Sequence, residues 1–438
     1  MDSTPPERGT LDRLYSFLVE EEDARVCKDI PEEACTQVPG NFFKIGASQV
    51  LTKLADELSS AKTILPWVLT SMGAPAFWIG FLVPIRESGS LLPQLAIGEA
   101  VRHRPTRRGV WILGGILQAA ALGGMAAAAL FLRGGAGGLV VVALLVLFSL
   151  ARGLVSVAWK DITGKTIPKT RRGRLTGFTT SLGGFLTIGA GALLALALAG
   201  DPSLESLAVL LVGAAGLWLV ASGVLARVHE VPGATEGGKN GVREAFQRLD
   251  LLRTDLSFRR FVLVRALLVS TALAAPYYVA LAREHSGASG LLALFILASG
   301  LASALSSAFW GRFADRSSRS VLVRAATVAA SLGVLVFLLD LVGAMGRFTW
   351  MAPLAFFVLS IAHSGIRIGR KVYILDMASG SRRTDYVAVS NTVIGAVLLL
   401  AGSLGFLAPM VGSGGMLLLL SILGFAGAWG GRQLPEVQ

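Results

Sequence analysis

The chain has 438 residues, of which 53% are hydrophobic and only 16% charged, and its mean hydropathy is +0.65. Soluble domains carry about 25% charged residues, so this composition excludes a water-soluble enzyme, and the apolar content excludes a disordered chain. Two cysteines are too few for a disulfide-stapled secreted fold. We therefore expect a polytopic membrane protein with the lipid bilayer as a partner.

The net charge of +12 comes from 40 Lys and Arg against 28 Asp and Glu. A nucleic-acid-binding domain would gather basic residues on one face, with aromatic side chains for stacking. Here the basic residues stand in short clusters between apolar runs, which is typical of the cytoplasmic loops of membrane proteins. No nucleic-acid partner is expected.

Residues 1–45 differ from the rest of the chain, and we interpret them as an acidic cytoplasmic N-terminal extension. The segment lacks the basic start and apolar stretch of a signal peptide. Leu11, Leu14, Tyr15 and Leu18 follow helical spacing and predict a short amphipathic helix. Anionic lipid would repel its acidic face, so docking on basic loops is favoured over docking on the membrane surface.

Apolar stretches recur from about residue 46, each close to the roughly 20 residues that cross a hydrocarbon core. They predict an all-α membrane protein with about twelve transmembrane helices in two six-helix halves, 46–227 and 259–430. A cytoplasmic linker, 228–258, joins the halves, and a cytoplasmic tail, 431–438, follows the second half. The predicted spans are 48–71, 75–98, 109–132, 137–158, 174–199, 204–227, 259–282, 288–310, 320–343, 349–370, 385–406 and 408–430.

An internal repeat supports two spans, rather than one, before residue 100. The polar stretch Lys53–Lys62 alone would favour a single span at 63–85. However, similar residues recur 211 positions apart in the two halves, which indicates a parallel repeat. The recurring pairs are Ser149 and Ser360, Arg152 and His363, Lys160 and Lys371, and Arg172 and Arg383.

The distribution of Lys and Arg predicts the orientation, because loops rich in these residues stay in the cytoplasm. Alternate loops are rich in them, whereas the other loops hold little more than Arg133, Arg283 and Arg347. The termini and the linker are therefore expected on the cytoplasmic side of the cell (inner) membrane. The basic loops contain Arg102, Arg104, Arg107, Arg108, Lys165, Lys169, Arg171, Arg172, Arg174, Arg312, Arg316, Arg319, Arg370, Lys371, Arg382 and Arg383.

Charged residues inside the predicted spans need a cavity or a partner, because a charge at bilayer depth costs about 2.5–3.5 kcal/mol. Arg86 and Glu87 lie in the second span, and Asp56, Glu57 and Lys62 in the first. We expect Lys62 to contact Glu87, and Asp56 or Glu57 to pair with a basic group. These residues either line a central path, where Glu87 or Asp56 carries a coupled proton, or form a fixed ion network between two helices.

Further candidates stand at equivalent places in the two halves. Arg152 and its repeat mate His363 lie about two turns from the cytoplasmic ends of their helices. Facing one path, they would attract an anion; otherwise they are a snorkelling arginine and a core histidine. Trp67 and Tyr277 each follow a proline, and they either stack on a substrate or pack beside a helix kink.

The segment Gly311-Arg-Phe-Ala-Asp315-Arg316-Ser-Ser-Arg319 resembles the cytoplasmic loop motif of the major facilitator superfamily, G-x-x-x-D-R-x-x-R. It falls between the eighth and ninth predicted spans, where that family carries its second copy. The resemblance implies a transporter whose two halves rock about a central site, and it makes these loop residues part of a cytoplasmic gate.

The first copy of the motif departs from the family pattern. It begins at Gly98 and has Arg102 where the family has aspartate, which weakens the gate contact expected in the first half. The fifth predicted span holds Gly183 and Gly184 without the Gly-Pro pair of the family's antiporters. A drug–proton antiporter of the common type is therefore disfavoured.

The expected function is secondary active transport of a small solute by alternating access, with an organic anion as candidate substrate and protons as candidate coupling ions. A transport-inactive assembly factor or receptor is the main alternative, and a drug or amphiphile exporter is a further one. The sequence holds no phosphate-binding Gly-x-x-x-x-Gly-Lys loop and no His/Cys cluster. An enzyme, a cofactor and a metal site are therefore not expected.

Overall fold

The computed structural model describes residues 30, 32–92, 97, 101, 104–197, 202–233, 248–285, 290–314, 316–377 and 382–437. Within these ranges the regular structure is helical, with no strand, as predicted. The amphipathic helix predicted near residues 11–18 and the middle of the predicted linker lie outside the described residues.

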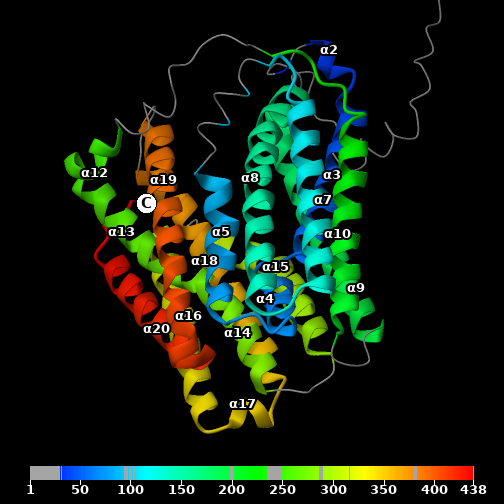
Figure 1. Ribbon diagram of the computed structural model, residues 1–438. Helices are drawn as coiled ribbons and strands as arrows, with labels where there is room; N and C mark the ends of the chain where they lie inside the picture. The colour runs from blue at the N-terminus through cyan, green and yellow to red at the C-terminus, as the bar shows by residue number, and fades with distance from the viewer. Residues whose placement is uncertain are drawn as a thin grey trace, which may run out of the picture.

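The helices form two groups that lie side by side in Figure 1. The first helix group is α3–α10 and the second is α13–α20. The first group contains α3 (Val38–Leu58), α4 (Ile64–Ser71), α5 (Phe77–Leu91), α7 (Arg108–Phe131), α8 (Gly134–Thr166), α9 (Lys169–Ala197) and α10 (Leu204–Leu225). The second contains α13 (Leu256–Leu268), α14 (Ser270–His285), α15 (Leu291–Ala314), α16 (Ser318–Leu341), α17 (Ala344–Arg347), α18 (Met351–Met377), α19 (Arg382–Gly402) and α20 (Ala408–Arg432). Shorter elements are α2 (Glu32–Cys35), α12 (Leu251–Thr254) and the 3₁₀ helices η1 (Arg248–Asp250) and η2 (Ser403–Leu407).

Eight helical segments in the described part of the chain are long and apolar enough to cross a membrane. Their outer faces carry exposed apolar side chains, such as Leu193, Val209 and Leu400, which are 68%, 69% and 74% exposed. Apolar surface on this scale belongs in contact with lipid rather than water. The chain is therefore a multi-pass membrane protein.

Helix packing in the two groups follows the same pattern. In the first group α3 packs on α9 and α10, α7 packs on α8 and α10, and α5 packs on α8. In the second group α13 packs on α19, α14 on α20, α16 on α18 and α20, and α15 on α18. When 211 is added to the residue numbers of α7, Arg108–Phe131, its bounds fall within one residue of those of α16, Ser318–Leu341.

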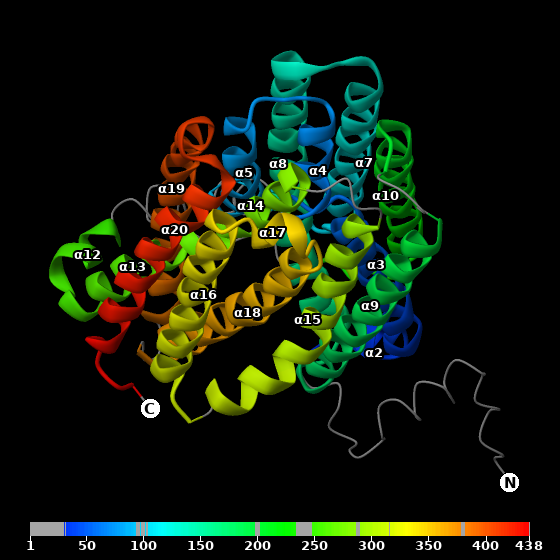
Figure 2. The same ribbon diagram turned by 90° about the horizontal axis from the view of Figure 1, so that it is seen from below.

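The groups contact each other through α5 with α19, α9 with α15, and α4 with α14 (Figure 2). The first two contacts are equivalent, because the repeat makes α15 the counterpart of α5 and α19 the counterpart of α9. Near the start of α5, Gly80 approaches Gly405 of η2 so closely that a Cβ on Gly80 would lie 2.4 Å from the Gly405 Cα. Small residues permit such backbone contact between membrane helices. The two groups are therefore in direct backbone contact where the start of α5 meets η2.

The first predicted span differs from the structure. It was expected as one helix over 48–71, but α3 begins at Val38 and ends at Leu58, and α4 begins at Ile64. Ser59 Oγ donates to the Ala55 carbonyl at 2.7 Å in the last turn of α3. Pro66 has no N–H and would clash in a continuous helix, whereas in the first turn of α4 it costs no hydrogen bond.

Candidate functional site

Asp56 of α3 is held by two arginines from neighbouring helices. Its Oδ1 accepts a hydrogen bond from Arg86 Nη2 of α5 at 3.1 Å, and its Oδ2 lies 2.6 Å from Arg152 Nη1 of α8. The guanidinium of Arg86 lies 5.0 Å from the ring centroid of Phe148, and that of Arg152 lies 5.6 Å from the Trp218 ring. Asp56 thus joins three helices of the first group in an ion network with aromatic support.

A polar cavity lies where the end of α3 and the following loop face α14, α15 and α18 of the second group. We call it the serine cavity. Glu57 Oε2 accepts a hydrogen bond from Ser299 Oγ of α15 at 3.0 Å, and this bond joins the two helix groups. The polar lining consists of Glu57, Ser60, Lys62, Thr271, Ser299, Ser303, Ser306, Ser360, His363, Ser364 and Arg367.

A second cavity, the arginine cavity, shares His363 with the serine cavity. Glu87 of α5 lines it from the first group, and Arg265 of α13 and Arg370 of α18 line it from the second. Arg265 donates from Nη1 to Ser390 Oγ at 2.6 Å and from Nη2 to Asn391 Oδ1 at 2.9 Å. Both partners are neutral, so Arg265 brings a full positive charge to the cavity wall.

The charge balance of the two cavities is positive. The described lining residues include the cations Lys62, Arg265, Arg367 and Arg370, against the carboxylates Glu57 and Glu87. His363, Arg367 and Arg370 share one face of α18, because they are spaced i, i+4 and i+7. His363 Nδ1 lies 3.1 Å from Thr271 Oγ1 of α14. An excess of fixed cations in a cavity with low-dielectric walls attracts an anionic solute.

Some predicted neighbours do not meet. Among the described residues no ion pair joins Lys62 to Glu87, although the two opposite charges attract each other. The predicted direct contact is therefore not formed, and the two charges face each other from adjoining cavities, Lys62 in the serine cavity and Glu87 in the arginine cavity. Arg152 pairs with Asp56 and lines neither cavity, whereas His363 lines both.

The two aromatic candidates lie in packed positions. Trp67 is 1% exposed and has the Arg283 guanidinium 5.4 Å from its ring. Tyr277 is 2% exposed and lies against Gly80 at the contact between the groups. Neither side chain lines the two cavities. The geometry favours the packing interpretation for both.

Arg265, Arg367 and Arg370 are cations of the cavity linings that sequence reasoning did not propose as site residues. Arg370 was counted among the residues of the basic loops, and Arg265 was not singled out. The spacing of His363, Arg367 and Arg370 on one helical face was the available signal for Arg370. No comparable pattern surrounds Arg265.

A scan against protein-family models matches the Major Facilitator Superfamily over residues 57–395. The chain belongs to the major facilitator superfamily. No curated protein sequence matches the chain significantly. The match to the family model confirms the family that the loop motif indicated.

Solved structures of superfamily-type transporters share the fold. A POT family transporter in complex with a thioalcohol-conjugated peptide has 13% sequence identity and a TM-score of 0.67, over 92% of this chain and 98% of that one. A D-xylose–proton symporter has 14% identity and a TM-score of 0.69, over 91% and 99%. A variant of the nucleoside transporter NupG has 12% identity and a TM-score of 0.70, over 90% and 99%.

The superfamily loop motifs are partly described in this chain. Gly98 and Arg102 of the first copy and Asp315 of the second lie outside the described residues. Gly311 lies in α15 and Arg316 in the turn that follows it. Arg319, the second residue of α16, turns toward the C-terminal tail.

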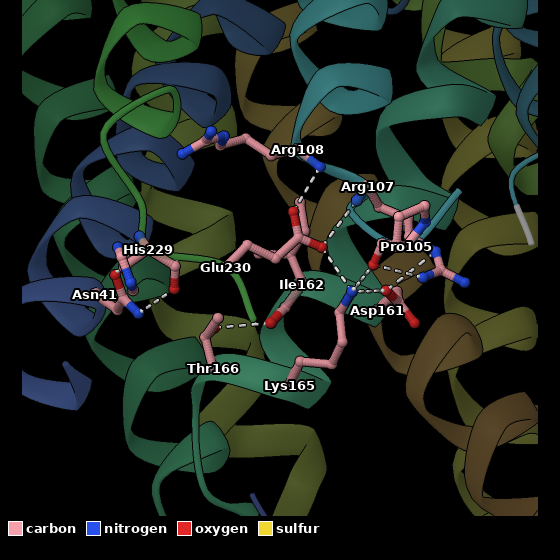
Figure 3. Close-up of polar contacts among 10 residues, drawn as sticks. All are labelled: Asn41, Pro105, Arg107, Arg108, Asp161, Ile162, Lys165, Thr166, His229 and Glu230. Atoms are coloured by element: carbon pink, nitrogen blue, oxygen red, sulfur yellow. Dashed lines mark hydrogen bonds and ion pairs between the residues drawn. The ribbon is translucent and has the colours of Figure 1, made fainter. Parts of the chain in front are cut away.

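The segment after α10 closes the loop side of the first helix group. We call Val228–Glu230 the first strap. Glu230 is directed at the start of α7, where its carboxylate accepts hydrogen bonds from the backbone N–H groups of Arg107 and Arg108, each at 2.8 Å (Figure 3). Lys165 of α8 lies 2.7 Å from the same carboxylate, whose side chain is 1% exposed. A carboxylate here satisfies free N–H groups and complements the helix dipole.

The first strap is also anchored through its backbone. Asn41 of α3 donates to the His229 carbonyl and accepts from the His229 N–H, each at 2.9 Å (Figure 3). Arg108 Nη1 donates to the Val228 carbonyl at 2.8 Å. The strap therefore binds the ends of α3, α7 and α8 together.

The second helix group has an equivalent segment, Leu434–Glu436, which we call the second strap. Arg319 Nη1 donates to the Leu434 carbonyl at 3.0 Å, and its Nη2 lies 2.9 Å from Glu436 Oε2. Ser317, the N-cap of α16, donates to Glu436 Oε1 at 2.9 Å. Arg108 and Arg319 are 211 positions apart, so repeat-related arginines hold both straps.

Proposed function

We propose that the chain is a secondary transporter that moves a small organic anion by alternating access. The observation that carries the proposal is the cationic lining of the two adjoining cavities between the helix groups. Arg265 and Arg370 would bind the anion, and His363 stands where both cavities can reach it. The neighbours' peptide, xylose and nucleoside substrates are chemically diverse, so the substrate class is inferred from this chain's own charges.

We propose twelve membrane crossings in two six-helix halves, with the linker and both termini in the cytoplasm. The shared packing pattern supports this topology, because it makes α3 with α4 the counterpart of α13 with α14. Helices α4 and α5 are short by themselves, and α3 carries polar residues, so length and composition alone do not mark them as spans. The basic loops supply the orientation.

The halves are proposed to rock as rigid bodies. Each strap binds helices of its own half, and no strap contact among the described residues crosses between the halves. Rocking therefore leaves the straps intact and changes only the contacts between the halves. Among these, the Glu57–Ser299 hydrogen bond lies beside the serine cavity and would break when that side opens.

We propose Glu87 as the proton-coupling carboxylate. Asp56 is already neutralised by two arginines, whereas Glu87 faces the arginine cavity without an ion pair among the described residues. A proton on Glu87 would increase the positive charge available to an anion, and its release would lower it. Binding of the anion and of the proton would thus favour each other.

A ligand screen tests the proposed substrate class. Purified protein would be heated with succinate, citrate, glucose 6-phosphate, neutral glucose or an amphiphilic cation, and the unfolding midpoint recorded. We expect at least one anion to raise the midpoint, and the effect to be lost in Arg265→Gln and Arg370→Gln. Arg174→Gln, an exposed arginine of α9, is the control. Stabilisation by the amphiphilic cation alone would instead support a drug exporter, and stabilisation by none a transport-inactive protein.

A further inference from the structure

An aromatic groove with two arginines lies between the end of α15 and the start of α16. Phe309, Trp310 and Phe313 line it from α15, and Ser317, Ser320, Val321 and Arg324 line it from α16 and its N-cap. Arg316 occupies the turn between them. This groove is separate from the two central cavities, whose lining residues are different.

The floor of the groove is rigid. Trp310 Nε1 donates to the Ile361 carbonyl of α18 at 2.8 Å. The indole lies flat against Gly365, where an added Cβ would come within 2.7 Å of Trp310 Cε2. Phe309 packs edge-on against Trp310, with ring centroids 4.9 Å apart. The groove therefore exists before any ligand arrives, which lowers the entropy cost of binding.

The groove opens toward lipid. Leu301, Leu305 and Phe309 are 42%, 57% and 52% exposed, and their spacing of four residues places them on one face of α15. On α16, Arg324 stands one turn before Val328, which is 45% exposed. Arg324 thus lies on the lipid-facing side of α16, nearer than Val328 to the N-terminal end of the helix, where lipid headgroups lie.

The fold does not require an arginine at this place. The repeat mate of Arg324, 211 positions earlier, is Leu113 of α7, which is 52% exposed. A lipid-facing leucine at the same place in the first half shows that the packing pattern accepts an apolar residue. The charge of Arg324 is therefore specific to the second half.

Arg316 and Arg324 have no acidic partner among the described residues, and both are exposed. Their neighbours Ser317 and Arg319 are engaged by Glu436 of the second strap. The N-terminus of α16, a helix of 24 residues, adds positive potential beside them. The site thus combines an aromatic wall with two arginines that no described carboxylate neutralises.

We propose that this groove binds an anionic phospholipid of the membrane leaflet on the basic-loop side. Arg316 and Arg324 hold the phosphate, and an acyl chain lies along Phe309, Trp310 and Phe313. The aromatic wall favours a lipid over free phosphate, because free phosphate has nothing to place against it. Basic pockets between helices on this side of a membrane are suited to anionic headgroups.

Thermal unfolding in detergent with added lipid tests the proposal. Dioleoylphosphatidylglycerol should raise the midpoint of the wild-type protein more than dioleoylphosphatidylcholine does, and inorganic phosphate should leave it unchanged. In R316Q/R324L the two lipids should act equally, whereas R174Q should behave as wild type. An undiminished preference for phosphatidylglycerol in R316Q/R324L, or an equal effect of inorganic phosphate on wild type, would overturn the proposal.

Quenching of tryptophan fluorescence by dibrominated phosphatidylglycerol gives a second readout. Trp310 should supply a saturable part of the quenching that W310F lacks. R324L, which installs the residue of the repeat mate and so preserves the fold, should weaken the apparent affinity about fivefold. An unchanged affinity in R324L, or unchanged saturable quenching in W310F, would place the lipid elsewhere.

Discussion

Glu230 and Glu436 occupy equivalent positions in the two halves of the molecule, each shortly after the last helix of its half and beside the start of α7 or α16, respectively. Arg108 and Arg319, their repeat-related partners, donate to the carbonyls two residues before each glutamate. The two carboxylates differ in their exposure to solvent. The Glu230 side chain is 1% exposed, whereas that of Glu436 is 38% exposed.

This difference predicts unequal costs for the same substitution. Glu230→Gln should lower the free energy of unfolding by about 2 kcal/mol, because it weakens charged hydrogen bonds to two backbone N–H groups and leaves Lys165 with Asp161 as its one remaining carboxylate among the described residues. Glu436→Gln should cost at most about 1 kcal/mol, because a solvated ion pair contributes little. Thermal unfolding in one detergent compares the two variants. A larger loss for Glu436→Gln would contradict this account of the straps.

The Asp56 network predicts that neutralising its carboxylate lowers stability more than neutralising one of its arginines. Asp56→Asn leaves Arg86 and Arg152 facing each other without a carboxylate, and it should lower stability by about 3 kcal/mol. Arg152→Gln should cost less, because Asp56 keeps Arg86. Expression level and unfolding midpoint measure both. If Asp56→Asn were the milder change, Asp56 would not be the organising charge of this network.

The glycine contact between the halves predicts a strong effect of one methyl group. Gly80→Ala would place a Cβ 2.4 Å from the Gly405 Cα, so the halves must separate near the start of α5. We expect a lower unfolding midpoint. Gly123→Ala in α7 is the matched control, because its Cβ would meet nothing within 4 Å and alanine favours helix. Equal midpoints for the two variants would show that the close contact is unimportant.

Much of the fold could be predicted from the sequence. Long apolar runs bounded by polar loops predicted α7 at 109–132, and it is found at Arg108–Phe131. The loop motif predicted the superfamily, which the family match confirms. Both signals are local in the chain, because hydrophobic length and loop composition are set by the membrane itself.

The site was harder to predict, because it depends on contacts between distant helices. Asp56 or Glu57 was expected to pair with a basic group, and the sequence could not choose between the two carboxylates or among the available arginines. The predicted partners Lys62 and Glu87 line different, adjoining cavities. Lys62 lies in the break between α3 and α4, which the prediction of one continuous helix did not include. Arg265 was missed because its partners, Ser390 and Asn391, are neutral residues from a helix more than 100 positions away.

Transport across a liposome membrane tests the central proposal most directly. Protein reconstituted into proteoliposomes would be supplied with the anion that stabilises it best, with and without an imposed pH gradient. We predict saturable transport that the gradient accelerates, a loss of the gradient's effect in Glu87→Gln, and a loss of transport in Arg265→Gln but not in Arg174→Gln. Transport that persists unchanged in Arg265→Gln, or no transport of any anion by the wild-type protein, would contradict an anion pathway through these cavities.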